Sequence, residues 1–157
     1  MYDLPHDLLD ALKATPETLA GLLDGVGAEE ARSARGGDEN WSVVEVICHL
    51  RDAEEFFIKR YQAMRDQDNP AIIGYDQAAL AIERNYKSAD LDAALEGFKT
   101  FRQQAMTELS KLAPEQWQRS GQHNEMGQIT ILGQAIHHVS HDAIHCAQIA
   151  RQLKDGN

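Results

Sequence analysis

The chain has 157 residues and a formal net charge of −10, with 43% hydrophobic and 25% charged residues. This length suffices for one domain with a hydrophobic core, so we expect a single domain spanning residues 1–157. The acidic charge repels phosphate backbones and anionic lipids, and no cluster of lysine and arginine offsets it, which argues against nucleic acid or a membrane as a partner. The first residues lack the basic start and the apolar run typical of a signal peptide, and the two cysteines fit reduced thiols, so we expect a cytoplasmic location.

Apolar residues recur at spacings of three and four, the period of an amphipathic helix, and no segment shows the sustained alternation of a strand. A first helix is expected over residues 5–23, with Pro16 marking a kink or a short break. A second is expected over residues 42–66, where Ser42 and Glu45 have the spacing of a capping box.

A long connection follows between residues 68 and 88, with one short helix expected around 77–84. The third helix is expected over residues 90–112, and Pro114 ends it. A polar stretch then leads to a fourth helix that begins at Thr130. Four long helices with one long crossover connection predict an all-α four-helix bundle.

The fourth helix carries the sequence HHVSHDAIHCAQI, which places His138, His141 and His145 on one stripe. His141 and His145 can therefore bind one ion from adjacent turns, and neutral imidazole is the commonest metal ligand. Such a pair needs a third ligand. In the segment WSVVEVICHL of the second helix, His49 lies beside the apolar residues and would face the bundle.

Few charged residues interrupt the fourth helix, so we expect it to be buried on most sides. One of its sides presents small or apolar groups, namely Gly133, Ser140, Ile144 and Ala147. These residues let another helix approach closely. They predict a homodimer, with the first helix of the same chain as the alternative cover.

These features resemble the DinB/YfiT-like superfamily, in which a Trp-Ser start leads to His-Leu on the second helix and the last helix carries His-x-x-x-His. The resemblance runs almost end to end and includes the segments ATPETLAGLLDG, FKTFRQQAMTELSKL and HHVSHDAIHCAQI. It implies a four-helix bundle and places the family's metal triad on His49, His141 and His145. It also implies a metal-dependent enzyme, because members include thiol S-transferases and a thiol-dependent isomerase.

Three neutral imidazoles from two helices leave positions open on a divalent ion, as in catalytic rather than closed structural sites. Zinc or nickel is the expected ion, although imidazole also suits copper and iron. The favoured reaction transfers a low-molecular-weight thiol, as co-substrate, to a small-molecule electrophile. Metal-dependent hydrolysis is the alternative, and a non-enzymatic metal-stabilised binding or dimerisation module is the competing class.

Several other side chains leave alternatives open. His138 fits a fourth ligand, an orienting hydrogen-bond partner or a packed core histidine. Glu45 and Asp142 are candidates to orient a ligand through its second ring nitrogen, and a purely structural role fits each of them equally well. Arg51 and Arg102 are candidates to contact an anionic substrate.

Overall fold

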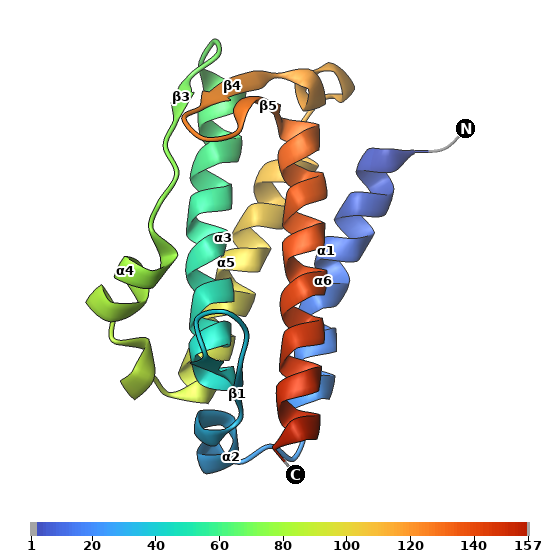
Figure 1. The fold of residues 1–157 in the computed structure, drawn as a ribbon. Coiled ribbons are helices and arrows are strands. Elements are labelled where there is room, and N and C mark those ends of the chain that lie inside the picture. The colour runs from blue at the N-terminus through green and yellow to red at the C-terminus, as the bar shows by residue number, and fades with distance from the viewer. Residues whose placement is uncertain (1–2, 157) are drawn as a thin grey trace.

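The computed structural model describes residues 3–156, and four long helices form its bundle (Figure 1). They are α1 (Leu4–Leu23), α3 (Val43–Asp66), α5 (Leu91–Ser110) and α6 (Ile131–Asp155). The predicted all-α four-helix bundle is confirmed. Pro16 lies inside α1, which continues past it, so the short break considered from the sequence does not occur.

The long crossover between α3 and α5 sets the topology of the bundle. This segment contains β3 (Ala71–Ile72), α4 (Gln77–Glu83) and the 3₁₀ turn η1 (Tyr86–Ser88), and it runs back along the outside of α3 (Figure 1). As a result, α5 begins at the same end of the bundle as α3, and the two helices run parallel. The helices α1 and α6 run in the opposite direction (Figure 1).

Capping side chains fix where the two histidine-bearing helices begin. The Ser42 hydroxyl accepts from the backbone N–H of Glu45, and the Glu45 carboxylate accepts from that of Ser42, so the predicted capping box is confirmed at the start of α3. The Thr130 hydroxyl accepts from the N–H of Gly133 at the start of α6. These bonds help to set which side chains of α3 and α6 face each other.

Two small sheets lie at opposite ends of the bundle (Figure 1), and neither was predicted from the sequence. At one end, beside α2 (Ala28–Ser33), β1 (Arg35–Gly36) pairs antiparallel with β2 (Trp41–Ser42). At the other end, after the turn η2 (Pro114–Gln118), β3 pairs parallel with β4 (Ser120–His123), which pairs antiparallel with β5 (Gly127–Thr130). The second sheet brings the crossover segment over the end of α3.

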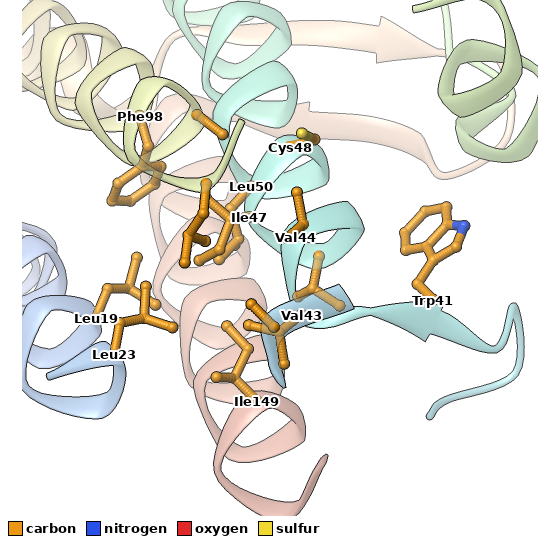
Figure 2. Close-up of a cluster of buried hydrophobic side chains, with 14 of the residues drawn as sticks. Leu19, Leu23, Trp41, Val43, Val44, Ile47, Cys48, Leu50, Phe98 and Ile149 are labelled. Carbon is orange, nitrogen blue, oxygen red and sulfur yellow. The ribbon is translucent and has the colours of Figure 1, made fainter. Parts of the chain in front are cut away.

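Buried hydrophobic side chains form two clusters inside the bundle. One draws on all four long helices and includes Leu19, Ile47, Phe98 and Ile149 (Figure 2). The other lies further along the bundle and includes Leu8, Leu12, Phe57, Tyr61, Leu109 and Ile131. Each large side chain buried in this way contributes about 1.5–3 kcal/mol, so the helices that carry the candidate site are firmly packed.

The helix α6 is more exposed than expected. Ile136 and Ile144 are 43% and 63% exposed, and Ser140 and Ala147 are exposed as well. The expectation of burial on most sides is wrong, because small residues tolerate solvent and a helix with few charges can still present one face to it. The homodimer stays a prediction, which sedimentation at micromolar concentration tests.

No helix within residues 3–156, α6 included, has the length and apolar composition needed to cross a bilayer.

Candidate metal centre

Three histidine side chains meet between α3 and α6. His49 lies two turns into α3, and His141 and His145 lie one turn apart on the antiparallel α6. The Nε2 atoms of His49 and His141 are 2.9 Å apart, and the three pairs of ring centroids are separated by 4.5 to 4.9 Å. One nitrogen from each ring can be chosen so that all three lie within 4.8 Å of one another. The structure therefore brings together the three residues to which the resemblance assigned the metal.

The protonation of these histidines suits a metal ion. Burial, followed by the neighbouring His145, lowers the pKa of His49 to about 3. Burial and the other two rings hold the pKa of His141 well below its usual range, and burial also lowers that of His145. The rings are therefore neutral at pH 7, as metal ligation requires. A nitrogen separation of 2.9 Å also suits two bonds of about 2.0–2.1 Å to one ion.

Gln148 orients one of the three rings. Its Oε1 lies 2.8 Å from Nδ1 of His145, and because an amide oxygen only accepts, Nδ1 carries the proton. The lone pair of His145 is therefore on Nε2, the atom left free for an ion. The amide NH2 of Gln148 donates to the carbonyl of Gly36, which fixes the orientation of the amide. Gln148 was not predicted from the sequence, although its position three residues after His145 on one helix is a usable signal.

His138 lies one turn from His141 but faces elsewhere. Its Nε2 is 2.6 Å from a carboxylate oxygen of Glu54, and its Nδ1 is 3.1 Å from the hydroxyl of Tyr61. The ring is completely buried and stacks on Phe57 at a centroid distance of 3.8 Å. Of the three alternatives left open by the sequence, the structure supports a packed, hydrogen-bonded core histidine.

Asp142 and Arg102 belong to the same buried network. Asp142 accepts hydrogen bonds from Thr15 at 2.6 Å and from Arg102 at 2.9 Å, and Arg102 also binds both carboxylate oxygens of Glu54. Arg102 is 2% exposed and fully engaged, so its expected contact with an anionic substrate is wrong. Ligand atoms of Glu54, His138 and Asp142 also lie within 4.8 Å of one another, but a metal ion there would have to displace the guanidinium that neutralises these carboxylates.

The remaining two candidates from the sequence have structural partners. The Glu45 carboxylate binds the backbone of Ser42 and, at 2.9 Å, the guanidinium of Arg35, rather than a triad histidine. Arg51 binds Asp52 at 2.7 Å, and it lies outside the lining of the cavity beside the triad. The expected role of Arg51 in substrate contact is therefore wrong as well.

A cavity of about 260 Å³ borders two of the three histidines of the triad. His49 and His141 line it together with the aromatic rings of Phe56, Phe57 and Tyr75. The rings of Phe56 and Tyr75 stack face to face with centroids 3.7 Å apart. Metal ligands beside a cavity that combines aromatic and polar side chains are a usual arrangement of a small-molecule site. Polar residues that were not predicted from the sequence line it as well, among them Arg60, His123 and Glu125.

Comparison with known proteins identifies a family, a relative and a solved structure that this chain is similar to. The sequence model of the DinB superfamily matches residues 11–149. A protein of Bacillus subtilis (strain 168) named "Putative metal-dependent hydrolase YfiT" is 25% identical over 120 residues, which cover 74% of this chain and 67% of that protein. The solved structure of Bacillus subtilis YfiT, described as a "probable metal-dependent hydrolase with an unusual four-helix bundle topology", has a TM-score of 0.88 at 22% identity and spans 96% of this chain and 86% of that one.

Proposed function

Given that this chain belongs to the DinB superfamily, we propose that it is a metal-dependent hydrolase whose divalent ion is held by His49, His141 and His145. The observation that carries the proposal is the meeting of three neutral imidazoles beside a cavity that admits a small molecule. The name of the Bacillus subtilis relative supports hydrolysis as the reaction.

A bound divalent cation supplies Lewis acidity, which lowers the pKa of a water molecule beside it and polarises a carbonyl group. The protein's own side chains prepare the site. Gln148 holds the His145 ring in the tautomer that a ligand needs, and Trp41 packs against the His49 ring at a centroid distance of 5.1 Å. Phe56 and Phe57 form apolar walls that limit the access of bulk water to the reacting bond.

Thiol transfer, which the sequence analysis favoured, would use the same three ligands. The names given to the relatives refer to hydrolysis. Hydrolysis therefore becomes the first candidate and thiol transfer the second. A closed structural site is the weakest candidate, because the triad borders a cavity.

The test uses protein purified without an affinity tag and loaded with zinc or nickel. We expect cleavage within a panel of small ester and amide substrates at a rate that requires the metal. His145→Ala should lose this activity, whereas His6→Ala, which removes an exposed histidine of α1, should keep it. Metal-dependent conjugation of a thiol to an electrophile, with no hydrolysis, would replace the proposal with the transferase. If neither assay detects metal-dependent activity, the non-enzymatic structural module becomes the favoured function.

A further inference from the structure

The cavity beside the triad also reaches a group of hydrogen-bond donors. Arg60 follows His49 by about three turns of α3, or roughly 16 Å of helix rise, and both residues line the same cavity. His123 of β4 lines it too, because the sheet of β3, β4 and β5 lies over this end of the bundle. A ligand that fills the cavity can therefore contact His49 and His141 of the triad together with these donors.

Arg60 differs from the other arginines of α3 in its partners. Arg51 pairs with Asp52, and Arg65 pairs with Asp66 and Glu108. Within residues 3–156, Arg60 forms no salt bridge, and its guanidinium donates only to the side-chain oxygen of Gln134, at 3.3 Å. A partly buried cation without a carboxylate partner favours an anion.

The charge of Arg60 is only weakly offset by its surroundings. Burial lowers the pKa of Arg60 from its ordinary value, but an arginine side chain remains protonated in proteins. Glu125 also lines the cavity, and its charge acts on Arg60 from beyond salt-bridge distance. The positive charge therefore remains available to a ligand.

His123 presents a buried donor to the same region. Its Nδ1 accepts from the backbone N–H groups of Glu125 at 3.1 Å and Met126 at 3.3 Å, so the ring proton is on Nε2. His123 is 3% exposed, and among the described residues its Nε2–H has no acceptor. An unsatisfied buried donor is costly, and an acceptor on a ligand would remove that cost.

Gln134 provides a second buried donor without an acceptor among the described residues. Its Oε1 is used by Arg60, which fixes the amide orientation, and its Nε2 has no acceptor within the described chain. Of the three buried side-chain atoms that lack a partner in residues 3–156, two are thus donors next to Arg60, and the third belongs to Gln152 at the other end of the bundle. Two unpaired buried donors therefore lie near Arg60, while the cavity's one lining carboxylate, Glu125, forms no salt bridge with it among the described residues.

We infer that Arg60 and His123 bind an anionic group of the substrate, so that the proposed hydrolase acts on small acidic molecules. A planar guanidinium binds a carboxylate through two parallel hydrogen bonds, and the Nε2–H of His123 provides a further donor. The stacked rings of Phe56 and Tyr75 would contact the body of the substrate, and the bond to be cleaved would lie next to the triad. The assignment of that bond rests on the proposed function, whereas anion binding does not.

The test measures binding to the metal-free protein, so that the triad offers no ion for an acid to coordinate. Isothermal titration with 3-phenylpropionate should show binding, and the uncharged isostere 3-phenylpropionamide should bind at least about tenfold more weakly, because charged hydrogen bonds are the stronger ones. Phenylphosphonate separates a phosphate-type ligand from a carboxylate, since both share the anionic chemistry. Tighter binding of either acid than of the amide supports the anion subsite and identifies its preferred group.

Matched variants assign the binding to residues. Arg60→Gln and His123→Phe should each weaken binding of the acid by about tenfold, and Arg60→Lys should weaken it less, because it keeps the charge and loses the paired geometry. Arg65→Gln, on the same helix but paired with Glu108, should leave it unchanged. Thermal unfolding checks that each variant is folded. Equal binding of acid and amide, or wild-type binding by folded Arg60→Gln, would overturn the inference. Anion binding without any hydrolysis would refute only the proposed function.

Discussion

The guanidinium of Arg102 donates to both carboxylate oxygens of Glu54, at 3.0 and 2.6 Å, and each side chain is at most 2% exposed. The pair joins α5 to α3 at the centre of the bundle. Burial alone would raise the pKa of Glu54, but His138 and Arg102 hold it at about 2. By binding His138, Glu54 also fixes a ring that would otherwise lie free one turn from the triad.

This network predicts a large cost for removing its cation. Arg102→Met should lower the free energy of unfolding by about 3–5 kcal/mol, because Glu54 and Asp142 would remain buried without their partner. Denaturant unfolding measures the change. Arg65→Met, which breaks partly exposed ion pairs, should cost about 1 kcal/mol or less. Equal costs for the two variants would contradict the assigned importance of the buried pair.

The contact between Gln148 and His145 makes a second prediction. Gln148→Leu should weaken metal binding by about 10- to 100-fold, because the His145 ring loses the hydrogen bond that fixes its tautomer. The stoichiometry should remain one ion per chain, since all three ligands are still present. A competition titration with a chelator of known affinity measures the change.

Gln152 provides the control for that experiment. It lies one turn further along α6, and it donates to the backbone carbonyls of Ala34 and Trp41 rather than to a histidine. Gln152→Leu should therefore lower stability without a comparable loss of metal affinity. If both variants weaken binding equally, the orienting role of Gln148 is wrong.

The lowered pKa values of the triad predict how stability depends on pH. In the metal-free protein, His49 stays neutral far below pH 6.5, whereas the histidines of the unfolded chain gain protons below about pH 6.5. Because the unfolded state then binds more protons, the free energy of unfolding should fall as the pH drops from 7 to 5. His49→Gln should reduce this slope, because it removes one of the buried rings. Stability that is flat or rises toward pH 5 would show that the folded rings are not protected from protons.

The sequence predicted the helices of the bundle because their stabilising contacts follow a local period. Apolar spacing and the capping box at Ser42 located α3 to within a residue. The strands were not predicted, because they are only two to four residues long and because β3 pairs with a strand about fifty residues later in the chain. Pairing at such a distance leaves no periodic pattern in either segment.

In the candidate site, too, the local patterns could be predicted from the sequence and the long-range contacts could not. His141 and His145 could be paired from their spacing on one helix, and the family resemblance added His49. Arg102 is a buried structural cation, whereas Arg60 lines a cavity. Both are arginines on helices, and their roles differ because different side chains of other helices face them. The sequence does not show these neighbours. His123 is placed by the sheet of β3, β4 and β5, which itself could not be predicted.

The claim that His49, His141 and His145 hold one divalent ion is tested most directly by metal analysis of protein purified without an affinity tag and equilibrated with zinc or nickel. We expect one ion per chain in the wild type, loss of tight binding in each of the three alanine variants, and retention in His137→Ala, which removes a neighbouring histidine outside the triad. Stoichiometric metal in both His49→Ala and His141→Ala would contradict the assignment.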